Sequence, residues 1–160
     1  MVELPKQALM KYWDNGDIPW VTPADLTGYT DLYISGGRRN ITDNGLKSSS
    51  AKLLSENSVI FSCRAPIGHI AIAENELAIN QGFKGITPKE NLDSEFVYYF
   101  LKNNVEEIQT RASGTTFKEI STSEFSRTKI SLPDKETQHR IVTAIESTFA
   151  VLDEIERNLI

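Results

Sequence analysis

The sequence has few of the residues from which most catalytic and metal sites are built. It contains one cysteine and two histidines among its 160 residues. A single cysteine, Cys63, excludes an intrachain disulfide and fits a reducing compartment, so we expect a cytoplasmic protein. The two histidines, His69 and His139, lie far apart along the chain, which disfavours a zinc site. No apolar run reaches the length of a membrane-spanning helix, and Met1–Met10 shows no export signal.

Several catalytic motifs are also missing. No proline follows Asn or Asp, so the Pro-Pro loop of amino-methyltransferases is absent. The Gly-x-Gly-x-x-Gly cofactor loop, the Walker phosphate loop, the Gly-x-Ser-x-Gly nucleophile elbow and the nuclease patterns Asp-x-Lys and Glu-x-Lys do not occur either. A Cys63–His69 nucleophilic pair is conceivable, but Cys63 ends an apolar run, where a buried structural thiol is the commoner role. We therefore predict a chain without catalytic activity, metal or cofactor.

The net charge of −5 argues mildly against nucleic acid, because DNA binding depends on Lys and Arg side chains that meet phosphates. The distribution of charge says more than the sum. Residues 35–52 carry four cations against one carboxylate, and residues 109–129 carry four cations against two. Both segments are rich in Gly, Ser and Thr. Either they contact a polyanion, or the cations cluster by chance in solvated loops.

The pattern of apolar and turn residues predicts an α/β (α+β) fold with a small mixed or antiparallel sheet and short helices. We expect residues 1–35 to be irregular, a turn at 43–45 and a short helix over 48–54. The predicted strands have alternating or short apolar runs bounded by turns: 59–63, 69–73, 77–79, 85–87 and 129–132. A helix over 94–111 follows from its apolar spacing, with Asp93 or Ser94 as its cap, and Ser121 with Glu124 predicts another short helix.

The C-terminal segment predicts one long helix that begins after Asp134. Its seam positions are spaced by four and three residues, as in a coiled coil: Ile141, Ile145, Thr148, Leu152, Ile155 and Leu159. About 26 helical residues would span roughly 39 Å, which is long for a domain of this size. The apolar stripe therefore pairs with a partner helix in its last turns, or it packs along its own domain.

Five segments, in order along the chain, resemble the target-recognition domain of type I restriction-modification specificity subunits. They are YWDNGDIPWVTPADL (12–26), RRNITDNGLKSSSAKLLSENSVIFSCRAPIGHIAI (38–72), AINQGFKGITP (78–88), ASGTTFKEIS (112–121) and ISLPDKETQHRIV (130–142). Such subunits usually contain two recognition domains and two long helices, whereas one of each is present here. The N-terminal strand and Gly-Thr-Pro loop that usually precede the Tyr-Trp pair are shortened or replaced by Val2–Lys11.

This resemblance implies a half-subunit with a DNA-binding target-recognition domain over 1–133. Residues 134–160 would form the conserved helix, which serves as spacer, dimerisation element and methylase docking site. The implied partners are double-stranded DNA and the methyltransferase and restriction subunits, which supply the S-adenosylmethionine, ATP and Mg²⁺ chemistry. A homodimer through the C-terminal helix, with Ile141, Ile145, Leu152, Ile155 and Leu159 in the seam, would read two identical half-sites. The alternatives are a small enzyme, and a regulator or decoy that docks on the methylase without reading DNA.

The DNA-contact residues that we predict are cationic, amide or hydroxyl side chains in loops: Arg38, Arg39, Lys47, Ser49, Arg64, Gln81, Arg111, Ser113, Thr115, Thr116 and Lys118. Arginine can contact guanine with two hydrogen bonds or hold a phosphate. Asn80 can pair with adenine or close a hydrogen-bonded turn, and the turn is the interpretation that we favour. The aromatic residues Trp13, Trp20, Phe83 and Phe117 are expected in the core rather than stacked on bases.

Overall fold

The computed structural model describes residues 10–64, 66–115 and 118–159. Its strands form two four-stranded sheets, ordered β3-β1-β7-β4 and β2-β6-β5-β8. The strands are β1 (Ile18–Val21), β2 (Tyr33–Ile34), β3 (Arg39–Ile41), β4 (Lys52–Leu54), β5 (Val59–Ser62), β6 (Ile70–Ala73), β7 (Leu77–Ile79) and β8 (Phe83–Ile86). Each sheet combines antiparallel pairs with one parallel pair, β1 with β7 and β2 with β6. The predicted α/β class with mixed pairing is confirmed, but there are two small sheets rather than one.

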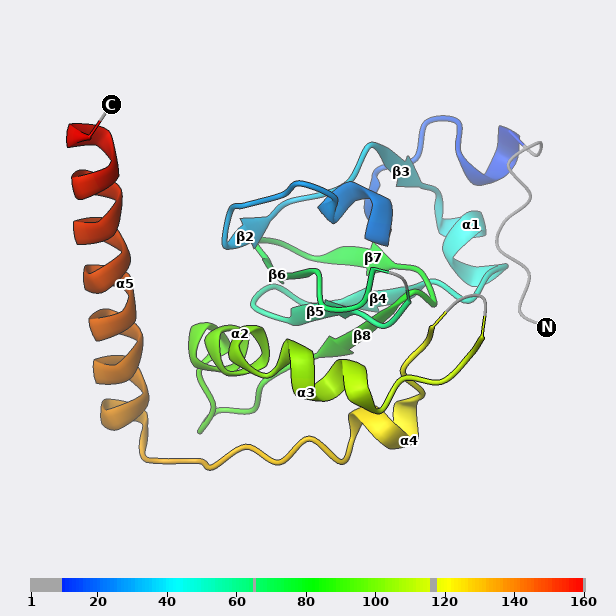
Figure 1. The fold of residues 1–160 in the computed structure, drawn as a ribbon. Coiled ribbons are helices and arrows are strands. Elements are labelled where there is room, and N and C mark those ends of the chain that lie inside the picture. Colours follow the sequence, from blue (N-terminus) through cyan, green and yellow to red (C-terminus); the bar gives the residue numbers. More distant parts are fainter. Residues whose placement is uncertain (1–9, 65, 116–117, 160) are drawn as a thin grey trace.

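Helical segments lie on the outer sides of the two sheets and beside them (Figure 1). They are the 3-10 turns η1 (Met10–Tyr12) and η2 (Pro23–Leu26) and the helices α1 (Asp43–Lys47), α2 (Ser94–Asn103), α3 (Val105–Thr110), α4 (Thr122–Phe125) and α5 (Lys135–Asn158). Helix α5 stands along one side of the molecule and contacts α2, whereas α1 lies at the opposite side (Figure 1).

The alternation of side chains along the strands creates three apolar layers. In β5, Val59 and Phe61 point toward α2 and α3, while Ile60 points into the space between the sheets. In β7, Leu77 and Ile79 fill that same space, and Ala78 packs on the outer side in a cluster with Trp13 and with Leu46 of α1. Because successive residues of a strand face opposite sides, a strand buried on both faces is apolar throughout. This is why the predicted strands 59–63, 69–73 and 77–79 are all found.

The N-terminal half departs most from the predictions. Residues 1–35 are not irregular throughout, since they contain β1, an interior strand of its sheet, and β2. The predicted turn at 43–45 is the start of α1, because Thr42 Oγ1 caps the helix by accepting a hydrogen bond from Gly45 N at 3.1 Å. The predicted helix over 48–54 does not form, and its last three residues, Lys52–Leu54, are β4, which pairs with β7. Pairing with a strand from elsewhere in the chain overrides the local preference there.

The predicted helix over 94–111 is interrupted at Asn104, so that α2 and α3 are separate helices. Asn104 Nδ2 donates to the Phe100 carbonyl at 2.7 Å, and its backbone leaves the helical conformation. Val105 then packs against Gly68, which has a φ of +99° and leaves no room for a side chain. The expected caps are confirmed: Asp93 accepts from Phe96 N, Ser121 from Glu124 N and Asp134 from Thr137 N.

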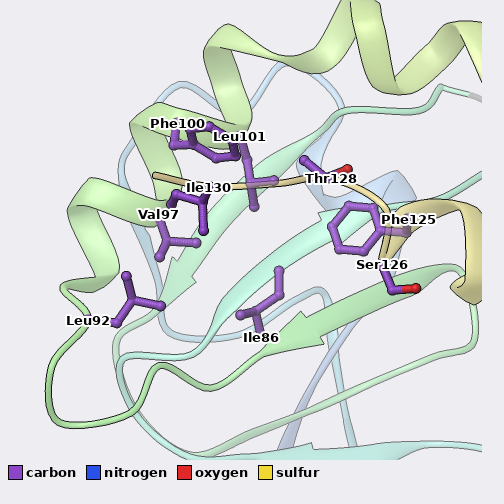
Figure 2. A pocket seen from close by; sticks show the side chains of 9 residues that line it. All are labelled: Ile86, Leu92, Val97, Phe100, Leu101, Phe125, Ser126, Thr128 and Ile130. Atoms are coloured by element: carbon purple, nitrogen blue, oxygen red, sulfur yellow. The ribbon is translucent and has the colours of Figure 1, made fainter. Parts of the chain in front are cut away.

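The predicted strand over 129–132 is wrong, because this segment pairs with no strand of the described structure. It runs extended across the molecule from α4 to α5 (Figure 1). Figure 2 shows Phe125 and Ile130 beside Val97 and Leu101 of α2 and near Ile86 of β8, around an apolar pocket of ≈ 160 Å³. The segment is thus held by side-chain packing, which an apolar pattern alone does not distinguish from strand pairing.

Candidate nucleic-acid interface

Backbone and side-chain hydrogen bonds bring four of the predicted DNA-contact loops together. Ser50 Oγ donates to Gln81 Oε1 at 3.1 Å, which joins the segment after α1 to the β7–β8 turn. Cys63 links that turn to the loop before α4, since its N–H donates to Gly82 O at 2.8 Å and its carbonyl accepts from Ile120 N at 2.9 Å. Hydrogen bonds therefore join segments that are far apart in sequence, at the side of the molecule away from α5 (Figure 1).

Arg38 and Arg39 lie at the start of β3, next to this surface. Arg38 is largely solvated, with 82% of its side chain exposed, and its Nε lies 3.8 Å from the buried carboxylate of Asp25. Asp25 is itself fixed by Thr22, whose N–H and hydroxyl both donate to Oδ2. The glycine before Arg38 is needed, since a Cβ at Gly37 would lie 2.7 Å from Asp25 Oδ2. The absence of a side chain at this glycine thus allows a close approach within the chain.

Arg39 extends over the Trp13 ring, with its guanidinium carbon 5.7 Å from the ring centroid. Trp13 in turn packs on Trp20 at 4.8 Å between centroids. Trp20 and Phe83 are buried, and Trp13 packs against the same cluster as Trp20, as expected of core aromatic residues. Phe117 lies outside the described residues. The Arg39 guanidinium lies over the Trp13 ring, and its side chain is exposed. Arg39 therefore presents a cation at a defined position on the surface.

Two hollows meet at Asn80, in the turn between β7 and β8. The smaller, of ≈ 260 Å³, is lined by Trp20, Asp25, Arg38 and Arg39 as well as Asn80. The larger, of ≈ 570 Å³, has Ser50, Lys52, Gln81 and Lys84 among its lining residues. Asn80 and Gln81 thus lie between two arginines on one side and two lysines on the other. Asn80 Oδ1 accepts a hydrogen bond from Gly82 N at 2.9 Å, so the favoured interpretation of Asn80 as a turn residue is confirmed.

Lys52 and Lys84 were not among the predicted contact residues. Lys52 is exposed on β4 and Lys84 is half-buried on β8, and both face the larger hollow. The sequence did contain a signal for Lys52, because it is one of the four cations of the basic segment 35–52. Lys84 alternates with the buried Phe83 in a strand, which places it on the other face.

The remaining predicted residues occupy differing surroundings. Lys47 pairs with Asp43 along α1 at 2.9 Å, with both side chains exposed. Ser49 Oγ accepts from Ala51 N at 3.2 Å. Arg64 lies 3.2 Å from Glu119, in side chains that are about half exposed. Ser113 forms a bridge with Glu119, and the exposed Thr115 and Lys118 follow in the same loop, whereas Thr116 lies outside the described residues.

Arg111 is committed to its own chain. Its guanidinium donates to Glu124 O, Glu107 Oε2 and Thr128 Oγ1 at 2.7–2.9 Å, and 15% of the side chain is exposed. Arg111 therefore ties α3 to α4 and to the segment that leads to α5. We do not include it in the interface proposed below.

The described structure offers no arrangement of nucleophile and base around Cys63. Cys63 Sγ donates to Gln81 O at 3.6 Å, while His69 Nδ1 is directed at the Leu26 carbonyl at 2.6 Å. Burial raises the pKa of the Cys63 thiol, which favours the unreactive protonated form. The described residues include no cluster of three or more His, Cys, Asp or Glu side chains that could hold a metal ion. Nor do they include a helix long and apolar enough to cross a membrane.

Helix α5 has two different apolar faces. Gln138, Val142, Ile145 and Phe149 share one face through steps of four, three and four, and this face lies toward α2. Gln138 is buried, and its side-chain amide accepts a hydrogen bond from Asp93 N and donates one to Asn91 O. The Phe149 ring stacks on the Tyr99 ring, with 6.5 Å between the ring centroids. The predicted seam is rotated from this face. Its exposed residues are Ile141 (39%), Leu152 (52%), Ile155 (50%) and Leu159 (81%), whereas Ile145 is half-buried at the border.

The sequence matches the family model "Type I restriction modification DNA specificity domain" over residues 2–160. The MjaIX specificity subunit of Methanocaldococcus jannaschii is 40% identical over 143 residues, which cover 88% of this chain and 33% of that protein. The EcoR124I/EcoR124II specificity subunit of Escherichia coli is 26% identical over 97% of this chain and 39% of its own length. The chain thus spans about a third of the length of these curated relatives.

Solved structures agree in fold. A chain from a structure of the assembly and conformational transition of the type I R-M system matches 98% of this chain and 37% of its own length, with a TM-score of 0.71 and 22% identity. The HsdS subunit from Thermoanaerobacter tengcongensis matches 99% of this chain and 36% of its own length, with a TM-score of 0.66 and 21% identity. Since the family model spans nearly the whole sequence, this chain belongs to the family of type I restriction modification DNA specificity domains.

Proposed function

We propose that this chain reads double-stranded DNA as the specificity component of a type I restriction-modification system. In this proposal, residues 1–133 form the DNA-binding head and residues 134–160 the helix that joins it to its partners. The chain recognises the DNA target in the cytoplasm, and the partner methyltransferase and restriction subunits catalyse the reactions there. The relatives are named as specificity subunits of type I restriction enzymes, which supports this division of labour.

The surface centred on Asn80 and Gln81 carries the proposal. It combines neutral amides at the centre with Arg38, Arg39, Lys52 and Lys84 at the sides. Cations that meet the phosphate backbone provide affinity and orientation, and short polar side chains between them can reach base edges in a groove. The chain's net charge of −5 does not oppose this, because Asp25 is the one carboxylate among the described residues that line the two hollows, and it accepts from Thr22 N and lies 3.8 Å from Arg38 Nε.

Binding to a mixed-sequence duplex at several salt concentrations tests the proposal. Replacing Arg38, Arg39 and Lys84 together with alanine should weaken binding and reduce the salt slope by about one for each phosphate that is no longer neutralised. The matched control replaces Lys89, Lys102 and Lys135, three cations that do not line the two hollows. If the two triple variants have the same affinity and salt slope as the wild type, the chain is a regulator or decoy that docks on the methylase without reading DNA.

We further propose that two copies pair through the exposed face of α5. Residues 135–144 of the helix carry Lys135, Arg140 and one glutamate, whereas residues 145–158 carry four carboxylates and one arginine. An antiparallel pair places the basic half of each helix beside the acidic half of the other, and a parallel pair places like charges together. Charge therefore favours an antiparallel pair, with one head near each end and a two-fold axis between them.

A further inference from the structure

The acceptor atoms of the interface are already in use within the chain. Asn80 Oδ1 accepts from Gly82 N at 2.9 Å, and this assignment is firm because a backbone N–H can only donate. Gln81 Oε1 accepts from Ser50 Oγ at 3.1 Å. Both oxygens of Asp25 are occupied by Thr22 and by the Arg38 backbone, and Glu119 is paired with Arg64.

The donors of the same side chains remain available. Among the described residues, neither Asn80 Nδ2 nor Gln81 Nε2 donates a hydrogen bond, and neither is a buried atom without a partner. The flanking side chains Arg38, Arg39, Lys52 and Lys84 can only donate. Among the described residues that line the two hollows, the amide and carboxylate oxygens thus each accept at least one hydrogen bond within the chain, whereas the amide N–H groups of Asn80 and Gln81 donate none.

A surface of donors discriminates among base edges. In the major groove, guanine presents two adjacent acceptors, N7 and O6. Adenine presents an acceptor beside an amino donor, cytosine presents an amino donor, and thymine presents a single acceptor, O4, beside a methyl group. An asparagine that pairs with adenine uses its own oxygen as acceptor, and the oxygen of Asn80 already accepts from Gly82 N, whereas its N–H groups are unused among the described residues. We propose that Asn80 and Gln81 select guanine at the base pair that they face. This inference rests on the proposed function and names the base edge that the same surface takes.

The first test uses the wild-type chain, so that folding is not in question. Binding selection from a duplex library with a randomised central segment should return sites with an invariant guanine. Replacing that guanine with 7-deazaguanine removes the N7 acceptor and leaves base pairing intact, so binding should weaken roughly tenfold. The same replacement at guanines outside the selected site is the control and should have no effect.

A second test changes the donor into an acceptor. In Asn80→Asp, the remaining oxygen can still accept from Gly82 N, so the turn is retained, but Nδ2 becomes a carboxylate oxygen. Repeating the selection with this variant should change one guanine position to cytosine or adenine, whose amino groups donate. Asn103→Asp makes the same charge change on an exposed residue of α2 and should leave the selected sequence unchanged.

The outcomes separate this inference from the proposed function. A guanine that is sensitive to 7-deazaguanine, together with a changed preference in Asn80→Asp, supports the inference. If the wild type selects a sequence but Asn80→Asp weakens binding equally at every sequence, Asn80 contacts phosphate, and the inference fails while the function stands. If the wild type selects no sequence and its binding does not depend on salt, both fail.

Discussion

Arg111 is a cation of a basic segment whose guanidinium is engaged within the fold. Its guanidinium makes three hydrogen bonds that join α3 to Glu124 and Thr128, and only a small part of it is exposed. Replacing Arg111 with alanine should destabilise the domain by about 2–3 kcal/mol, since the carbonyl of Glu124 loses a charged donor. Thermal or denaturant unfolding measures this change.

The salt dependence of DNA binding decides whether this role is structural only. Arg111→Ala should keep the wild-type salt slope at a temperature where the variant is folded, whereas Arg39→Ala should lower it by about one. Arg39 is a suitable comparison because its side chain is exposed and lies over the Trp13 ring. A reduced slope in Arg111→Ala would return this residue to the DNA interface.

At the scale of elements, the sequence predicts best those segments whose residue pattern fits one type of secondary structure. Strands β5, β6 and β7 are apolar on both faces, and α5 combines a cap at Asp134 with a long regular spacing. The prediction of secondary structure fails where contacts with segments distant in the sequence determine it. Lys52–Leu54 is a strand because β7 lies beside it, and Ile130 lies over α2 without pairing as a strand.

The candidate site divides in the same way. The residue types of the interface are visible in the sequence as two cationic, hydroxyl-rich segments. Their juxtaposition is not, because it depends on contacts such as Ser50 with Gln81, which lie 31 residues apart. The commitment of Arg111 to Glu124 and the position of Lys84 beside Asn80 likewise follow only from the three-dimensional arrangement.

The free face of α5 leads to a prediction about assembly. Leu152 and Ile155 expose about half of their side chains, and α2 covers only the neighbouring face of the helix. Replacing both with glutamate places four like charges in a paired seam, so the variant should be monomeric where the wild type is dimeric. Light scattering or sedimentation equilibrium measures the mass.

The matched control adds the same two charges at Thr143 and Ala150, which are exposed positions on the side of α5 away from both faces. This control should remain dimeric, and a chain truncated after Ala144 should be monomeric because it lacks most of the seam. A wild-type chain that is monomeric at every concentration tested would contradict pairing through α5.

At the scale of the whole molecule, the interface and the free helix face lie far apart. The loops around α1 and the segment after α3 are at one side of the molecule, and α5 is at the other (Figure 1). DNA binding at one side therefore need not obstruct a partner at the other. In an antiparallel pair the two heads project from a common helical spacer, so each can reach its own segment of the same duplex.

This geometry predicts the form of the DNA target. Two identical heads related by a two-fold axis should prefer two copies of the selected half-site in inverted orientation. When one head is bound, the second binds at a high effective concentration, so a duplex with two correctly spaced half-sites should bind about 100-fold or more tightly than one with a single half-site. A series of duplexes that differ only in the spacing between half-sites measures this gain, which should peak at one spacing and its helical repeats.

The variant with glutamate at positions 152 and 155 isolates the cause of that gain. It should bind a single half-site as well as the wild type, because both residues lie on α5 and away from the interface, but it should lose the advantage of the second half-site. Equal gains in the two proteins would show that the heads are coupled through DNA or through another surface. A wild type without any preference for spacing would show that each head reads alone, and the second half of the reader would then have to come from a different polypeptide segment.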